Sequence, residues 1–243
     1  MITRSPSLTD QVKAHIRERI EAGAFEEGRI PPEVELADEL GVSRTTVRDA
    51  LSRLENEGAI YRRQGAGTFV NEQGLQIRSR LEEIWSYTKV LEDHGYTPSV
   101  QVVAEVTGPP DDATAEVLGL EDGEEVLSIT KLFLEDDAPV ILTTNHIPLR
   151  ILADSDYSED ETLPLYEFIE DHSEQSLSYY LSEIIPTCLE GETAERLGVP
   201  DGTVALSFDE TGYDQANEPI VRATSYFRDD LLRFRLIRRR TRS

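Results

Sequence analysis

Residues 29–70, RIPPEVELADELGVSRTTVRDALSRLENEGAIYRRQGAGTFV, form the stretch that decides the fold of this chain. Its apolar residues recur at helical spacing in two segments, which are separated by a short turn. The first segment, 33–40, is expected to be a helix whose apolar face consists of Val34, Ala37 and Leu40. Gly41 is expected to end this helix, because glycine enters the left-handed backbone region without a steric cost. Ser43 then serves as the N-cap of a second helix.

The second helix has the composition of a DNA-reading helix. Its buried stripe is predicted from the helical spacing of Val47, Ala50, Leu51 and Leu54. Polar side chains lie off that stripe near the N-terminus, namely Arg44, Thr45, Thr46 and Arg48. A helix that buries one side and offers arginine and threonine from its first turns suits contact with base edges in the major groove. One of the two threonines is alternatively a packing or capping residue.

The residues after this helix predict a two-stranded wing. One strand is expected over 59–63 and the other over 68–71, with the tip QGAG between them. Glycine at the tip lets backbone amides approach a phosphate or a minor groove closely. The residues expected to bind DNA are Glu33, Ser43, Arg44, Thr45, Thr46, Arg48, Arg62, Gln64, Gly65, Gly67 and Thr68. Such a module can also bind proteins, but arginines concentrated in an otherwise acidic chain favour DNA.

The segments PPEVELADELGVSRTTVRDAL and EGAIYRRQGAGTFV resemble, in order and spacing, the DNA-binding domain of the GntR family of bacterial and archaeal transcription regulators. The resemblance covers residues 8–71 and implies a winged helix-turn-helix domain over 1–72. Two positions depart from the family pattern. Pro32 replaces a usual serine, which removes a hydroxyl, and Ala66 replaces a frequent basic residue of the wing tip. An additional helix over 8–22, with Leu8, Val12, Ile16 and Ile20 at regular spacing, is expected to pack behind the reading helix.

Acidic residues dominate the composition. The 243-residue chain carries 24 basic and 48 acidic side chains, for a net charge of −24. Residues 1–75 hold 10 basic and 13 acidic side chains, and residues 76–243 hold 14 and 35, so the excess lies mainly outside the expected DNA reader. Many carboxylates with only three lysines are typical of cytoplasmic proteins from extreme halophiles, in which high salt screens the repulsion between like charges. The sequence therefore predicts a haloarchaeal protein. An ordinary acidic protein is the alternative.

Two classes of protein are disfavoured by the sequence. It has no apolar run long enough to span a membrane and no N-terminal signal pattern, so a cytoplasmic location is expected. The single cysteine, Cys188, cannot form an intramolecular disulfide and is expected to be a small core residue. The histidines are scattered, and neither a metal site nor a cofactor is expected.

The rest of the chain predicts an α+β domain with an internal repeat. A polar linker is expected over 73–79, followed by a helix over 81–92. Residues 114–127 then parallel residues 193–206, each copy being a short helix, a glycine turn and an apolar strand. Strands are expected over 100–106, 126–134, 139–147, 177–185, 204–213 and 219–227. Strands that are interrupted by helices and joined as hairpins favour an antiparallel sheet. The repeat predicts two halves related by an approximate two-fold axis, and ligands often bind where such halves meet.

This domain is similar to the UTRA effector domain of the HutC branch of GntR regulators, which shares its fold with chorismate lyase. The resemblance rests on DHGYTPS, LGLEDGEEVLSITKLFL and YFRDDLLRF, and implies an effector-binding and dimerisation domain over 80–237. Two family arginines correspond to Lys131 and Phe133, a family acid to Thr143, and a family tyrosine to Leu232. With two further basic residues, the implied effector site is Lys131, Phe133, Thr143, Arg222, Arg228 and Leu232. Lys131 and Arg228 are alternatively partners in structural ion pairs.

These features favour a ligand-responsive transcription regulator over an enzyme. It is expected to bind a near-palindromic operator as a homodimer, with half-sites about one helical turn apart. The effector is expected to be a small anion, an organic acid with an apolar part being favoured over a sugar phosphate. A lyase-like enzyme using Lys131, Glu183 and Arg228 is the alternative, although no acid and base stand at a recognisable spacing. The basic tail, 238–243, is expected to be solvated or to contact DNA or the acidic body.

Overall fold

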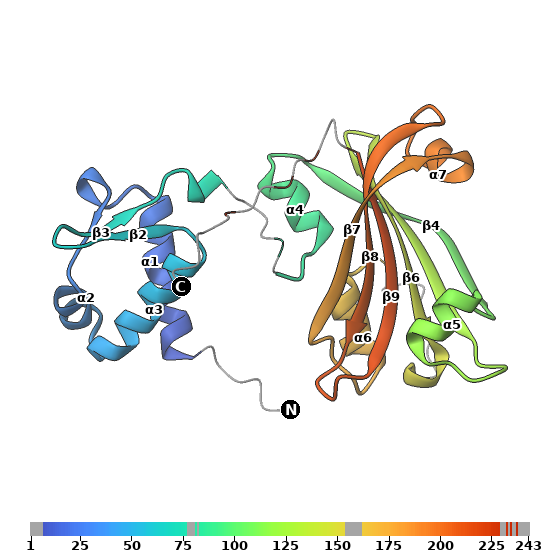
Figure 1. The fold of residues 1–243 in the computed structure, drawn as a ribbon, viewed down its shortest axis with the longest axis horizontal. Helices are drawn as coiled ribbons and strands as arrows, with labels where there is room; N and C mark the ends of the chain where they lie inside the picture. Colours follow the sequence, from blue (N-terminus) through green and yellow to red (C-terminus); the bar gives the residue numbers. More distant parts are fainter. Residues whose placement is uncertain are drawn as a thin grey trace. The chain divides into compact units, whose positions relative to one another are not determined.

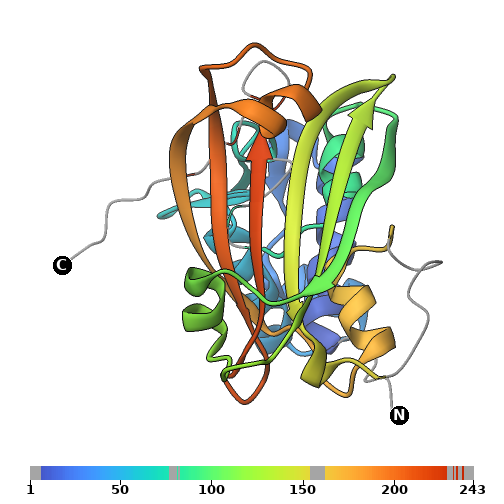
Figure 2. The same cartoon turned by 90° about the vertical axis from the view of Figure 1, so that its right-hand side faces the viewer.

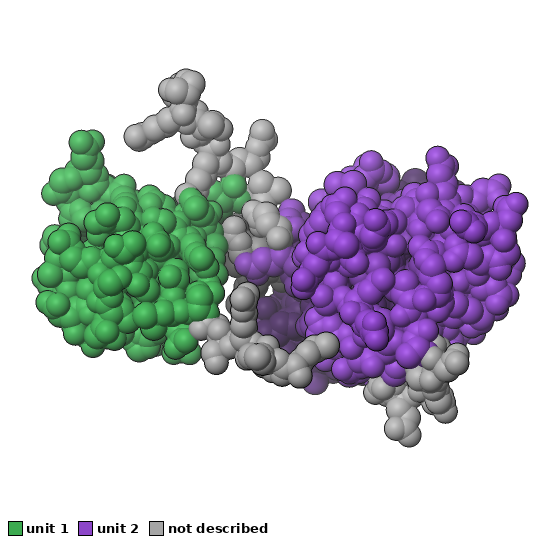
Figure 3. Space-filling view, turned by 90° about the horizontal axis from the view of Figure 1, so that it is seen from below, with its two compact units in different colours: residues 1–80, 235–243 green, residues 81–234 purple. Residues whose placement is uncertain are grey.

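The computed structural model describes residues 7–76, 81, 83–153, 162–228, 232, 234 and 237. The chain divides into two compact units, which Figure 3 colours separately. Unit 1 comprises residues 1–80 and 235–243, and unit 2 comprises residues 81–234. The end of the expected linker, 77–79, and the basic tail, 238–243, lie outside the described residues. No helix in the described part of the chain is both long and apolar enough to cross a membrane.

Unit 1 is a three-helix domain with a small antiparallel sheet (Figure 1). Its elements are α1 (Leu8–Glu21), β1 (Arg29–Ile30), α2 (Glu33–Leu40), α3 (Arg44–Asn56), β2 (Ile60–Arg63) and β3 (Gly67–Val70). The expected helices and wing are confirmed, and Gly41 ends α2 with a φ of 64°. The sheet has the order β1-β3-β2, so the wing contains a third strand that the sequence did not reveal.

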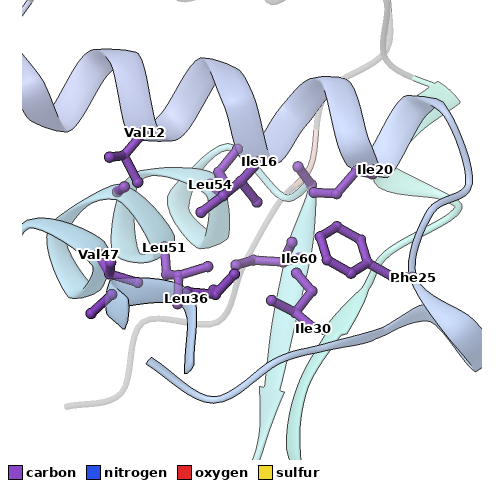
Figure 4. Close-up of a cluster of buried hydrophobic side chains, with 13 residues drawn as sticks. Val12, Ile16, Ile20, Phe25, Ile30, Leu36, Val47, Leu51, Leu54 and Ile60 are labelled. Carbon is purple, nitrogen blue, oxygen red and sulfur yellow. The ribbon is translucent and has the colours of Figure 1, made fainter. Parts of the chain in front are cut away.

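The core of unit 1 lies between α1, α2, α3 and the wing (Figure 4). The expected stripe of α3 is fully buried and packs against α1, whose Val12, Ile16 and Ile20 are also buried. Two expectations were wrong: Leu8 is 53% exposed and Val34 is 44% exposed. Leu8 is the first residue of α1, before the part of the helix that reaches the core. In α2 the buried face is centred on Leu36 and Ala37, so Val34 points to solvent.

Unit 2 is a six-stranded antiparallel sheet with two helices on each face (Figures 1 and 2). Its strands are β4 (Pro98–Gly108), β5 (Val126–Glu135), β6 (Ala138–Pro148), β7 (Tyr179–Leu189), β8 (Thr203–Tyr213) and β9 (Pro219–Phe227). Its helices are α4 (Tyr87–Asp93), α5 (Asp112–Leu118), α6 (Leu165–His172) and α7 (Gly191–Arg196). Helices α4 and α6 lie on one face of the sheet, and α5 and α7 lie on the other (Figure 1).

The strand order β4-β5-β6-β9-β8-β7 confirms the internal repeat. Each half runs strand, helix, strand, strand, and the last strands of the two halves pair at the centre of the sheet. Both hairpins skip one residue at the same place, since Leu134 pairs with Pro139 and Tyr213 pairs with Pro219. The approximate two-fold axis therefore passes through the pair Thr144 and Thr224, which are equivalent residues of the two halves.

Two expectations for unit 2 need correction, and one helix was missed. The helix expected over 81–92 begins only at Tyr87, because Ser86 is its N-cap and accepts a hydrogen bond from the Lys89 backbone N–H. The apolar spacing before Ser86 reflects packing rather than a helix, since Trp85 stacks on Phe234. Helix α6 was not foreseen. Cys188 is exposed rather than buried, because β7 is an edge strand.

We expect the Leu54→Ala substitution to destabilise unit 1 by ~2–5 kcal/mol, because Leu54 is fully buried between α3 and the rest of the core. Hydrogen exchange of unit 1 amides in the full chain measures this effect separately from unit 2. Leu8→Ala is the matched control and should change stability by less than ~0.5 kcal/mol, since Leu8 is exposed. Equal protection of both variants would show that the core is not centred on α3.

Candidate nucleic-acid interface and ligand cavity

The start of α3 presents its polar residues in two different ways. The Ser43 hydroxyl accepts a hydrogen bond from the Thr46 backbone N–H at 3.1 Å and lies 2.8 Å from the Thr46 hydroxyl. Ser43 and Thr46 therefore cap the helix. Arg44 and Thr45, in contrast, are exposed in the first turn. Of the two expected threonines, Thr45 is thus the one that points outward.

Glu33 joins the reading helix to the wing. Its carboxylate lies 3.1 Å from Arg48 Nε of α3 and 4.0 Å from Arg62 Nη2 of β2. Arg62 also lies 3.1 Å from Glu55. Exposed ion pairs of this kind add little stability. Their consequence here is orientation, because two expected DNA-contacting arginines are held beside one carboxylate at the start of α2.

Most basic side chains within residues 7–76 are paired with carboxylates. The pairs are Lys13 and Arg17 with Glu57, Arg19 with Glu39, Arg53 with Asp10, Arg48 with Glu33, and Arg62 with Glu55 and Glu33. Within residues 7–76, Arg29, Arg44 and Arg63 have no acidic partner within salt-bridge distance, and all three are exposed. Arg29 was missed from the sequence because it stands alone, ahead of the helix-turn-helix. Exposed guanidinium groups of this kind are suited to binding phosphate oxygens.

The wing places its tip through glycine geometry. Gly65 and Gly67 have φ values of 77° and 121°, which favour glycine over residues with a side chain. The guanidinium of Arg29 lies close to Gly67, so β1 brings a further charge to the wing. Gln64 is exposed at the tip, and Thr68 is half-buried where it pairs with Arg62. The structure thus gathers the expected wing residues beside an arginine from another strand.

Unit 2 contains a cavity of about 450 Å³ on the face of the sheet that carries α4 and α6. Its apolar walls include Trp85, Phe133, Leu165, Ile184 and Phe208. Its polar side chains include Tyr87, Lys131, Thr143, Asn145, Tyr166, Tyr180, Ser182 and Glu210. A largely apolar pocket with a few converging polar groups is the usual form of a small-molecule site.

Three of the six expected effector residues line this cavity. Lys131 is only 2% exposed, and its Nζ donates a hydrogen bond to the Leu163 carbonyl oxygen at 2.7 Å. Phe133 forms part of the apolar wall. The Thr143 hydroxyl accepts a hydrogen bond from the Ser225 hydroxyl at 3.0 Å, and the Tyr87 hydroxyl lies 2.8 Å from the same Ser225 hydroxyl. A chain of hydroxyl groups therefore crosses the floor of the cavity.

The other three expected effector residues lie elsewhere in unit 2. Arg222 points to the opposite face of the sheet, where it pairs with Asp209 at 3.3 Å and Asp111 at 3.5 Å. The reason is strand alternation, since the neighbouring Ala223 of β9 lines the cavity. Arg228 donates a hydrogen bond to the Pro139 carbonyl oxygen at 2.9 Å. Leu232 packs in the hydrophobic cluster beside α4 and does not line the cavity.

Glu210 is an ionisable cavity residue that the sequence analysis did not identify. It accepts a hydrogen bond from the Ser182 hydroxyl. Burial raises the pKa of its carboxyl above the ordinary value of 4.5, the hydrogen bond from Ser182 opposes the rise, and the charge of Asp209 adds to it. Glu183, expected as a catalytic acid, is instead exposed on β7 and does not line the cavity.

Two family models match the chain. The model described as "UTRA domain" matches residues 93–233, and the model described as "Bacterial regulatory proteins, gntR family" matches residues 8–70. The HTH-type transcriptional repressor NagR of Bacillus subtilis is 29% identical over 225 residues, covering 92% of this chain and 91% of that protein. An HTH-type transcriptional regulator of Mycobacterium tuberculosis is 31% identical over 247 residues, covering 99% and 87%.

A solved structure shows the same fold. The crystal structure of the possible transcriptional regulator YydK from Bacillus subtilis has a TM-score of 0.76 and covers 96% of this chain and 100% of that one. Its sequence identity is 17%, so the likeness concerns the architecture alone. The relatives are named as regulators and repressors rather than as enzymes.

We expect Glu210→Gln to stabilise unit 2 near neutral pH. A raised pKa means that the folded state holds the proton more tightly than the unfolded state, so stability falls as pH rises above 4.5. Glutamine keeps an oxygen acceptor for Ser182 and removes the buried charge. Thermal melts should therefore show a gain over the wild type near neutral pH that disappears below pH 4.5. Glu183→Gln, on exposed β7, is the control, and a gain independent of pH would contradict the assignment.

Proposed function

The chain belongs to the GntR family of transcription regulators and carries a UTRA effector domain, and we propose that it binds a near-palindromic operator as a homodimer controlled by a small anionic metabolite. Unit 1 is the DNA-binding part, and unit 2 is the effector-binding part. Its site of action is the cytoplasm, where the DNA of bacteria and archaea lies. The effector occupies the cavity of unit 2, with Lys131 as the partner of its negative charge.

One observation carries the DNA-binding proposal. Arg29, Arg44 and Arg63 are exposed and have no acidic partner within residues 7–76, although acidic side chains outnumber basic ones twofold in the whole chain. In so acidic a chain, a surface arginine would be expected to form an ion pair with a carboxylate. Arginines at the start of α3 and on the wing that have no acidic partner among these described residues are available to bases and phosphates. Arg44 is the residue we assign to base contact, and Arg63 and Arg29 are those we assign to phosphate.

Edge strand β7 is the surface that we assign to dimerisation. Leu181 and Ile185 of this strand lie on the face opposite the cavity, and both are exposed, Leu181 to 62% of its surface. The other edge strand, β4, is interrupted by a bulge, whereas the pairing of β7 with β8 is continuous. Pro186 has no N–H, so side-chain packing rather than continuous strand pairing supports the contact. A symmetric contact of this kind presents two readers to the two half-sites of an operator.

Effector control requires that the cavity bind its ligand with different affinity in two arrangements of the dimer. A ligand with equal affinity for both arrangements would not change DNA binding, however tightly it bound. The cavity is built from both halves of the repeat, because β5 and β6 come from one half and β8 comes from the other. A ligand that contacts both halves can therefore change their relative geometry.

Footprinting of the DNA upstream of its own gene tests the function, and Arg44→Ala tests the reading helix. The wild type should protect two half-sites about one helical turn apart. Arg44→Ala should lose ~1–3 kcal/mol of discrimination between this operator and unrelated DNA. Arg53→Ala is the matched control on the same helix, because Arg53 is paired with Asp10 near the end of α3. Unchanged selectivity of Arg44→Ala would refute its assignment, and no protected site would refute DNA reading.

Leu181→Lys should weaken the dimer about tenfold or more, corresponding to ~1.4 kcal/mol, because it places a charge in an apolar contact. Sedimentation velocity over a concentration series measures the dissociation constant. Val106→Lys is the control, since Val106 is 59% exposed on the opposite edge strand β4. If Val106→Lys dissociates the dimer and Leu181→Lys does not, the contact lies on β4 instead.

A further inference from the structure

The two halves of the repeat place opposite charges at equivalent positions. Lys131 pairs with Thr143 in one hairpin, and Glu210 pairs with Ala223 in the other. These pairs correspond to each other, because both lie the same number of steps from the skipped residue of their hairpin. Lys131 and Glu210 both line the cavity. The approximate two-fold axis thus relates an ammonium on one side to a carboxylate on the other.

The register between the halves fixes how these two groups are separated. Thr143 pairs with Ser225 across the centre of the sheet, and Ser225 pairs with Phe208, two residues from Glu210. Three strand spacings, or ~14 Å, therefore separate the backbones that carry the two charges. Thr143 and Asn145 lie on the floor between them. A ligand in this cavity therefore has a cationic group of the protein on one side and an anionic group on the other.

Each charged group has a defined setting. The Lys131 ammonium is 2% exposed, and its Nζ donates a hydrogen bond to the Leu163 carbonyl oxygen at 2.7 Å. The Glu210 carboxylate has two oxygens with about four acceptor positions, and the Ser182 hydroxyl and Tyr87 hydrogen-bond to it. Burial disfavours the charged form of Glu210, so ionisation of this carboxyl has an electrostatic cost. A positive group on the ligand would remove that cost.

We propose that the cavity selects a zwitterionic metabolite, whose anionic group meets Lys131 and whose cationic group meets Glu210. This inference rests on the proposed function, in which the cavity is the effector site, and it specifies the chemistry of the effector. A ligand with negative charge alone would bring like charge toward a buried carboxylate, which is unfavourable. A neutral ligand would remove water from both charged groups without replacing it. A ligand with one anionic and one cationic group matches the charge of the protein at both ends of the cavity.

Titration calorimetry of the full chain with matched compounds tests the proposal. Each of three sets contains a zwitterion, its anion-only analogue and its cation-only analogue. The sets are γ-aminobutyrate, butyrate and butylamine; phenylalanine, phenylpropionate and phenylethylamine; and glucosamine 6-phosphate, glucose 6-phosphate and glucosamine. In at least one set the zwitterion should bind about tenfold or more tightly than both analogues, as expected for two matched charge contacts.

Variants assign the two ends. Glu210→Gln should weaken zwitterion binding about tenfold while leaving the anion-only analogue unchanged or tighter, because it removes only the partner of the positive group. Lys131→Met should weaken both the zwitterion and the anion-only analogue. Glu183→Gln is the control, since Glu183 lies on β7 but outside the cavity, and it should bind like the wild type. Thermal melts of each variant show whether it is folded.

Three outcomes would overturn the proposal: an anion-only analogue that binds as tightly as its zwitterion, a Glu210→Gln variant that keeps the zwitterion preference, or no binding by any compound. Footprinting of the same preparation separates this inference from the proposed function. A protected operator without a zwitterion preference overturns the charge assignment alone. Absence of a protected operator overturns DNA regulation, whereas a zwitterion preference that follows Glu210 would still support the assignment of the cavity.

Discussion

Competition among carboxylates for a limited number of basic side chains is the constraint on which the chemistry of this chain depends, because acidic side chains outnumber basic ones twofold. Within residues 7–76 most basic side chains are paired with carboxylates, and Glu33 and Glu57 each pair with two. Such exposed pairs add little to stability, but they decide which positive charges face outward. Within residues 7–76, Arg29, Arg44 and Arg63 have no acidic partner, although Glu33 lies beside Arg48 and Arg62. The local fold therefore decides which arginines at the start of α3 and on the wing keep an exposed positive charge.

A second constraint, strand alternation about the pair Thr144 and Thr224, builds the cavity. Successive residues of a strand point to opposite faces, so a one-residue change decides whether a side chain reaches the ligand site. Arg222 and Ala223 illustrate this: the arginine pairs with Asp209 on one face, and the alanine lines the cavity on the other. The positive charge of the cavity therefore comes from Lys131, although arginines are far more common in this chain.

Local signals made most of the fold predictable. Helical spacing predicted α3, Gly41 predicted the end of α2, and prolines at the second residue of β6 and the first residue of β9 marked both hairpins. The helix expected over 81–92 was too long because apolar residues that pack as a loop have the same spacing as a helix. Arg29 and Glu210 could not be found locally, since their neighbours come from other strands. Glu210 did leave a signal, because the 79-residue offset of the repeat leads from Lys131 directly to it.

Duplication accounts for the position of the cavity, and divergence accounts for its polarity. Two identical halves would place like charges at equivalent positions, and a ligand could then bind in either of two orientations with equal energy. Lysine in one half and glutamate in the other remove that degeneracy, so a ligand with two unlike ends binds in one orientation. A ligand fixed in this way makes both charge contacts only when the two halves are at a suitable separation. An arrangement that changes this separation would bind the ligand with a different affinity, and such a difference is what coupling between an effector site and a DNA reader requires.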